Sequence, residues 1–184
     1  MIHKHDMVML LMGSGVAMGL AVASLAGPIL EADTPPTLPP DVMSLAGVRK
    51  LGVRVQPFSP ALQEAGLNAL RVQHIWTERL RESGFQIVDD PNQPYVSLAV
   101  HTGNIQDEGG QRVFGLQFKF FQPLRFERLN RTLNVPTYAS GGFGMAGSTV
   151  LQEQVERSLN ARIEVFIALV DKATEFARVQ KQLD

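Results

Sequence analysis

Hydrophobic and polar positions alternate along most of the chain, with a period of either two or about 3.6 residues. Period two over residues 48–56 predicts a first strand, because Val53 and Val55 share one face and Arg54 takes the other. The same period predicts four further strands, at 85–88, 96–101, 114–127 and 133–140.

The strand expected at 114–127 is the longest, and it is predicted to have an aromatic inner face. Its apolar side chains all fall on even positions: Phe114, Leu116, Phe118, Phe120, Leu124 and Phe126. Proline has no backbone donor, so Pro123 indicates a bulge or a sheet edge.

Two segments follow the helical period. The first has an N-cap candidate in Asn68 and ends at Gly84. Its stripe comprises Val72, Ile75, Trp76, Arg79 and Leu80. The second is the last element, where Thr149 and Gln152 have the spacing of a capping box. Its apolar stripe comprises Leu151, Val155, Leu159, Ile163, Phe166, Val170, Ala173 and Ala177.

These elements occur in the order β-α-β-β-β-β-α. We therefore expect an α/β (α+β) domain, with a single mixed β-sheet of about five strands and two main helices on one face. The exported globular domain is expected over residues 45–184. Residues 27–44 are rich in proline and predict an extended linker, since proline fixes φ and removes a backbone donor.

Residues 1–26 are expected to be a targeting segment, because 7–26 carry no charge after a basic start. Two interpretations remain open. A signal peptide would be cleaved after small residues. A retained N-terminal membrane anchor would have Gly15, Gly19 and Ala23 at the spacing of a membrane-helix contact. Both place the domain outside the cytoplasm, in the periplasm or anchored to the cytoplasmic membrane.

Composition narrows the function classes. A length of 184 residues allows one domain plus appendages. The net charge of −1 gives no field that would attract a polyanion, so we expect no nucleic-acid partner. The chain has no Cys, which excludes disulfides, Cys-ligated metals, thiol catalysis and a lipidated cysteine.

A glycine motif lies between the fifth expected strand and the last helix. Gly142, Gly144 and Gly147 match G-x-G-x-x-G. A dinucleotide site would also need a further parallel strand, so we expect no cofactor. The glycines are expected to allow a tight crossover and close packing of the helix on the sheet. A second hypothesis is an anion-binding turn that uses the free N–H groups near Ser148 and Thr149.

Basic residues gather on or beside the long strand: Arg112, Lys119, Arg125, Arg128 and Arg131. They could form a solvated face that protects an edge from aggregation. They could instead form a basic interaction face for an acidic partner, anionic lipid headgroups or a surface polymer.

No grouping of residues predicts a catalytic or metal site. His74 and His101 are isolated from each other in the pattern. The acidic pairs fall in expected turns, where Asp is favoured in any case: Asp89 with Asp90, and Asp107 with Glu108. We therefore expect no enzyme, no cofactor and no metal.

Seven segments of the chain carry a resemblance to known proteins: Leu45-Ala46-Gly47-Val48, Val53-Arg54-Val55, Gly66-Leu67, Glu78-Arg79-Leu80-Arg81-Glu82-Ser83-Gly84-Phe85, Pro94-Tyr95-Val96-Ser97-Leu98-Ala99-Val100, Tyr138-Ala139-Ser140-Gly141-Gly142-Phe143-Gly144 and Leu169-Val170-Asp171. Through them the region 45–176 resembles a family of small exported bacterial proteins of unknown function. The element order is also similar to the amino-terminal domain of the Tol translocation protein and to penicillin-binding-protein activator lipoproteins. The latter resemblance implies a protein-interaction module.

The leading functional hypothesis is a non-catalytic cell-envelope module that binds an envelope or membrane protein through a strand edge or the basic face. The alternative is a membrane-anchored accessory subunit of a larger membrane complex, held by residues 7–26. An envelope hydrolase comes third.

Overall fold

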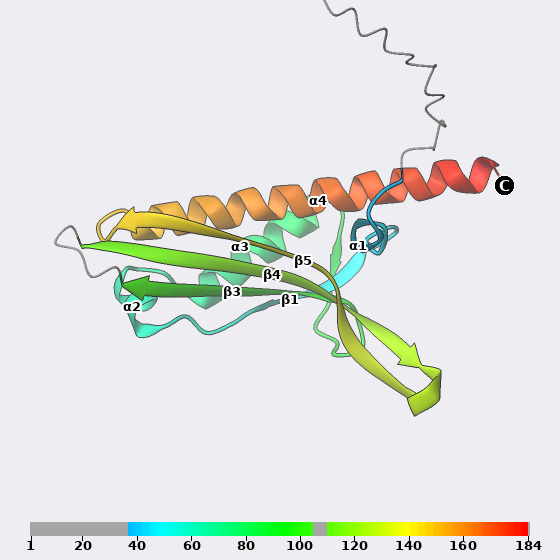
Figure 1. Cartoon of the computed structure of the whole chain (residues 1–184), viewed down its shortest axis with the longest axis horizontal. Helices are drawn as coiled ribbons and strands as arrows, with labels where there is room; N and C mark the ends of the chain where they lie inside the picture. The colour runs from blue at the N-terminus through cyan, green and yellow to red at the C-terminus, as the bar shows by residue number, and fades with distance from the viewer. Residues whose placement is uncertain (1–36, 105–109, 184) are drawn as a thin grey trace, which may run out of the picture. The chain divides into compact units, whose positions relative to one another are not determined.

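The computed structural model of the protein describes residues 37–104 and 110–183. Its elements, in chain order, are α1 (Pro40–Met43), β1 (Lys50–Val55), α2 (Pro60–Glu64), α3 (Ala69–Glu82), β2 (Gln86–Ile87), β3 (Tyr95–Asn104), β4 (Gln111–Phe126), the 3-10 turn η1 (Glu127–Leu129), β5 (Arg131–Gly147) and α4 (Leu151–Leu183) (Figure 1). Within these ranges no helix is both long enough and apolar enough to cross a bilayer. The expected targeting segment, with Gly15, Gly19 and Ala23, lies outside the described residues and stays a prediction.

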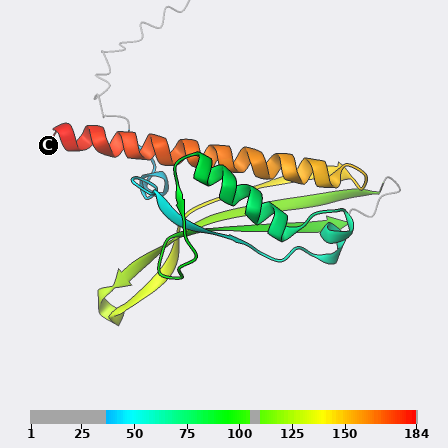
Figure 2. The ribbon, with the colours of Figure 1, turned by 180° about the vertical axis from the view of Figure 1, so that it is seen from behind.

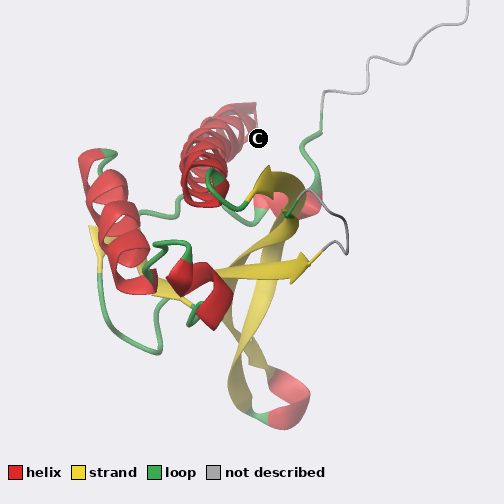
Figure 3. Cartoon of the chain, turned by 90° about the vertical axis from the view of Figure 1, so that its left-hand side faces the viewer, coloured by secondary structure: helices red, strands yellow, loops and turns green. Residues whose placement is uncertain are grey.

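The five strands form one mixed sheet in the order β2-β1-β3-β4-β5. β1 pairs in parallel with β2 and β3, and β4 pairs antiparallel with β3 and β5. α3 and α4 cover the same face of this sheet (Figure 3). The expected mixed sheet with two main helices on one face is therefore confirmed.

Aromatic side chains of β4 occupy the centre of the core, as their even spacing predicts. The ring centroid of Phe118 lies 5.8 Å from that of Trp76 and 5.1 Å from that of Phe166. Phe118 therefore joins β4 to both α3 and α4. Phe120 lies 5.7 Å from Phe166 and is fully buried. The stripe of α4 is buried from Leu151 to Ala173, which also follows the prediction.

Beyond Tyr95, the first residue of β3, the hairpin of β4 and β5 continues as a projecting two-stranded ribbon (Figures 1 and 2). β3 pairs with β4 as far as Phe121, whereas β4 and β5 pair for five more residues on each strand. A bulge separates the sheet from the ribbon, because Thr137 of β5 has no opposite residue between Phe120 and Phe121. We call residues 122–135 the ribbon.

The prediction that the even positions of β4 face the core is wrong for its two apolar residues in the ribbon. Leu124 and Phe126 keep the even spacing but are exposed. The ribbon bends away from α4 after the bulge, so no helix covers these positions (Figure 2).

Part of the expected linker is folded. Residues 40–43 form α1, which begins with a proline at the first helical position, where a missing N–H costs nothing. Leu38 and Val42 pack against the core, and Leu45 is fully buried. The extended conformation predicted up to residue 44 is therefore wrong for α1, because apolar contacts with the sheet and α4 order this segment.

The start of α3 follows the predicted capping pattern. The Oδ1 atom of Asn68 accepts hydrogen bonds from the backbone N–H groups of Leu70 (2.9 Å) and Arg71 (3.1 Å). At the other end Gly84 has φ of 84°, which favours glycine after a helix.

Replacement of the cap gives a first testable prediction. Asn68→Ala is expected to lower the free energy of unfolding by about 1 kcal/mol, because two N–H groups lose their acceptor. Chemical denaturation measures this loss. Asn68→Ser is the matched control and should retain most of the stability; an equal loss in both variants would contradict the capping role.

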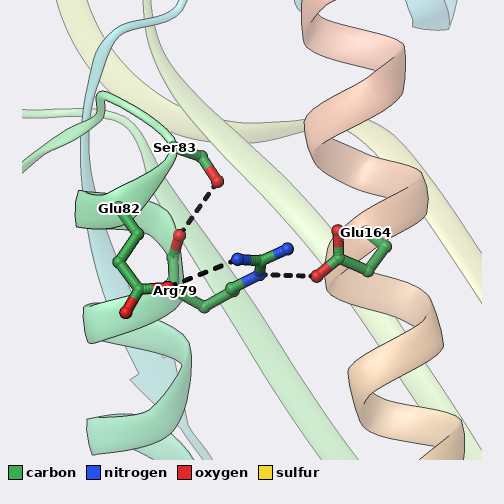
Figure 4. A network of polar contacts seen from close by, with 4 residues as sticks. All are labelled: Arg79, Glu82, Ser83 and Glu164. Carbon is green, nitrogen blue, oxygen red and sulfur yellow. Dashed lines mark hydrogen bonds and ion pairs between the residues drawn. The ribbon is translucent and has the colours of Figure 1, made fainter.

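A polar contact joins α3 to α4 on the surface (Figure 4). Arg79 Nε donates to Glu164 Oε1 at 2.6 Å, and Arg79 Nη1 donates to Glu82 Oε2 at 3.3 Å. The hydrogen bond from Arg79 lowers the pKa of Glu164 below its usual value, and the bond to Glu164 raises the pKa of Arg79. Both side chains are half exposed, so water screens the pair and its contribution to stability is small.

Candidate interaction site

The glycine motif lies inside β5, and not in a turn between strand and helix as expected. Gly144 pairs with Phe114 and Gly142 with Leu116. A Cβ atom on Gly144 would overlap the ring of Phe114, and one on Gly142 would lie 2.9 Å from Arg162 Nη2. The glycines therefore allow side chains from β4 and α4 to pack over the strand.

The turn between β5 and α4 is short. It spans residues 148–150, with Ser148 and Thr149 exposed, and α4 begins at Leu151. Gln152 of the expected capping box donates its side-chain amide to Glu156 Oε1 at 3.0 Å. Because Gly142 and Gly144 belong to the sheet, the structure does not gather the motif and this turn into one anion cradle.

β5 is the last strand of the sheet, and most of its length carries no charge. Between Arg131 and the end of the strand at Gly147 there is no Asp, Glu, Lys or Arg. Near the bulge, α1 lies against the strand, and Ser44 Oγ donates to the carbonyl oxygen of Thr137 at 3.3 Å. Arg162 Nη2 donates to the carbonyl oxygen of Gly141 at 3.0 Å. We call residues 139–147 the β5 edge.

Among the described residues, no helix covers the sheet face opposite α3 and α4 over β3, β4 and β5, and we call it the open face (Figure 3). A shallow depression of about 700 Å³ lies on it, lined among others by His101, Gln117, Lys119 and Phe143. Phe143 stands on this face with 91% of its surface exposed, and Met145 follows it with 60% exposed. The β5 edge thus presents two large apolar side chains on the open face.

A stack of three side chains lies elsewhere on the open face. The guanidinium carbon of Arg54 lies 3.7 Å from the ring centroid of Tyr95, and Tyr95 stacks on Phe121 at 4.8 Å. The arginine and the two aromatic rings cover one another there, so this part of the face is occupied by its own side chains.

The predicted basic face is not one surface. Arg125, Arg128 and Arg131 lie at the tip of the ribbon. Lys119 lines the depression, and Arg112 is near the other end of β4, where Nη1 donates to the carbonyl oxygen of Ala61 at 3.4 Å. The prediction of a single basic face is wrong because β4 is 16 residues long, so basic residues near its two ends are far apart.

The other chemistry-bearing residues are dispersed. His74 is exposed on α3 and His101 is exposed on the open face. Asp90 Oδ1 accepts from the backbone N–H of Asn92 at 2.9 Å, which is the turn role expected of it. In the described part of the chain, no group of three or more His, Asp or Glu could hold a metal ion. Asp107 and Glu108 lie outside that part.

Comparisons with known proteins give structural likeness only. No protein-family model matches the chain, and a comparison with curated proteins finds no match. The fold is similar to that of a PelC dodecamer from Paraburkholderia phytofirmans: 17% identity, TM-score 0.40, covering 66% of this chain and 88% of that one. It is similar to a minor lipoprotein from Acinetobacter baumannii: 14% identity, TM-score 0.28, covering 72% and 90%. A third similar structure is the hypothetical protein CT253 from Chlamydia trachomatis: 11% identity, TM-score 0.38, covering 64% and 98%.

Sequence reasoning missed Phe143 and Met145 as surface residues. Both residues fall on odd-numbered positions two apart, as in a strand, but the strand was expected to end at Ser140, whereas it continues to Gly147. The alternation of Phe143 and Met145 with glycine and alanine is the signal that could have extended the strand to Gly147.

Proposed function

We propose that this protein is a non-catalytic module of the bacterial cell envelope that binds an extended segment of another envelope protein along the β5 edge. The observation that carries the proposal is the long uncharged edge strand. Edge strands expose unpaired backbone groups, and proteins commonly protect them with charged residues, proline, bulges or covering elements. Within residues 37–104 and 110–183, such protection is concentrated around Pro136 and Thr137, and over the β5 edge it consists of Arg162, which bonds the carbonyl oxygen of Gly141.

Strand addition fits the surroundings of this edge. A segment that pairs with β5 gains affinity from main-chain hydrogen bonds and specificity from recesses for alternate side chains. Phe143 and Met145 are exposed side chains of the β5 edge, and Phe143 also lines the depression. Apolar side chains of a partner segment would bury both residues.

The composition of the depression supports binding rather than catalysis. Among the described residues, its lining includes one histidine and one lysine and no Asp or Glu. Among these described residues no carboxylate is therefore present to act as a general acid or base. The location in the envelope rests on the uncharged residues 7–26 of the sequence.

Site-specific photo-crosslinking in the native host tests the proposed edge. With p-benzoylphenylalanine at Met145, we expect one defined adduct with an envelope protein. The control is the same reagent at Leu70, which is also exposed but lies on α3. The same pattern of adducts from both positions, or turnover of a substrate in the depression, would contradict the proposal.

A charge-substitution variant measures the contribution of the edge. Phe143→Lys combined with Met145→Lys is expected to weaken binding of the crosslinked partner at least about tenfold, because cations would stand on the strand where the partner pairs. Both side chains are exposed, so the thermal stability should change little. Leu70→Lys is the matched control; if it weakens binding equally, the partner does not use the β5 edge.

A further inference from the structure

The ribbon concentrates exposed apolar side chains at its tip. Leu124, Phe126, Leu129 and Leu133 are between 39% and 53% exposed. They make up four of the eleven large hydrophobic residues that are exposed in the described part of the chain. Isolated exposed hydrophobic residues are normal, whereas a cluster at one projection indicates a binding surface.

Strand pairing gives the ribbon an apolar face. Leu124 lies opposite Leu133, and Phe126 lies opposite Arg131 on the same face. Arg125 pairs with Thr132, so these two side chains take the other face. Leu129 belongs to η1, at the extreme end of the ribbon.

Positive charge surrounds these apolar residues. Residues 122–135 contain Arg125, Arg128 and Arg131 against Glu127, which leaves a net charge of +2, although the whole chain has −1. Arg125 Nη2 donates to Asn130 Oδ1 at 3.0 Å, which ties that arginine to the turn. Among the described residues, no ion pair involves any of the three arginines.

We propose that the ribbon tip docks on a bilayer surface rich in anionic phospholipid. Its apolar side chains would enter the boundary between headgroups and acyl chains, while the arginines bind lipid phosphates. Guanidinium groups form strong charge-assisted hydrogen bonds with phosphate oxygens. A lipid surface adapts to a narrow projecting tip, whereas a protein partner would need a groove of matching shape. The proposal concerns the ribbon and is independent of strand addition at the β5 edge.

Because the chain has no cysteine, a single introduced one can carry a fluorescent probe of local polarity. Leu129→Cys labelled with the nitrobenzoxadiazole fluorophore reports on the ribbon tip of the full-length chain. Glu64→Cys, exposed on α2 far from the ribbon, is the matched control (Figure 1). Vesicles of phosphatidylcholine, with and without phosphatidylglycerol, provide the two surfaces. Comparison of the two label positions separates tip docking from any binding through residues 7–26, which brings both labelled proteins to the membrane alike.

With anionic vesicles, we expect a blue shift and a rise in emission at position 129, and neither at position 64. The shift should be lost with pure phosphatidylcholine and diminished in 1 M salt, where the screening length is only about 3 Å. The Arg125→Ala, Arg128→Ala and Arg131→Ala triple variant should also lose it, with its circular dichroism melt unchanged.

Three results would overturn the proposal. The first is no shift at position 129 on anionic vesicles. The second is an equal shift on both kinds of vesicle. The third is an equal shift with soluble polyglutamate or inorganic phosphate, which would assign the tip to an acidic protein or a free anion. None of these results affects crosslinking at Met145, so failure here and failure of the proposed function are distinguishable.

Discussion

Replacement of Phe118 by alanine is expected to lower the free energy of unfolding by about 3 to 5 kcal/mol. The side chain is 1% exposed, and its ring contacts those of Trp76, Phe166 and Tyr138 at centroid distances of 5.8, 5.1 and 6.0 Å. These contacts come from α3, α4 and β5. A cavity at this position would therefore remove packing from both helices and the sheet together.

Urea denaturation of Phe118→Ala and the unchanged chain measures this loss. Phe143→Ala is the matched control, because it removes the same ring from the outer face of β5, where 91% of the side chain is exposed. Its stability should stay within about 0.5 kcal/mol of the unchanged chain. Similar losses in both variants would show that Phe118 is not the centre of the core.

The second large effect is expected from Gly144→Val. The new side chain would occupy the space of the Phe114 ring, so either the ring or the backbone of β5 must move. Such overpacking costs about 1 to 3 kcal/mol of unfolding free energy. Thermal and urea denaturation would both record the loss.

Gly147→Ala provides the control for this substitution. It lies in the same strand and the same motif, but a Cβ atom there meets nothing within 4 Å, so little change is expected. If Gly144 acts only through packing, Gly144→Val should lower the free energy of unfolding by the same amount with and without phosphate. A loss that depends on phosphate would instead support the anion-binding turn.

Local spacing was sufficient to predict the main elements. Alternation places Phe114, Phe118 and Phe120 on one face of a strand wherever that strand lies, because successive side chains point to opposite sides. The stripe of α4 and the cap at Asn68 depend only on residues three or four positions apart. These features could therefore be read from the chain without knowledge of its partners.

The functional surfaces depended on distant contacts, and prediction failed there for physical reasons. Gly142 and Gly144 could form a turn or a strand by themselves; Arg162 of α4 and Phe114 of β4 occupy the space above them and favour the strand. Leu124 and Phe126 have the same spacing as the core residues of β4, but the bulge at Thr137 carries them away from α4.

By itself, the sequence determined the main strands and helices and the apolar side of each, since these follow from periodicity and from caps and turns within a few residues. The order of these elements also predicted the mixed sheet with two helices on one face. Only the tertiary structure decided which apolar side chains become buried, that the basic residues separate into a ribbon tip and two distant positions, and that an uncharged strand lies at the edge of the sheet. Burial and edges are properties of what packs against an element, and that is decided by residues far along the chain.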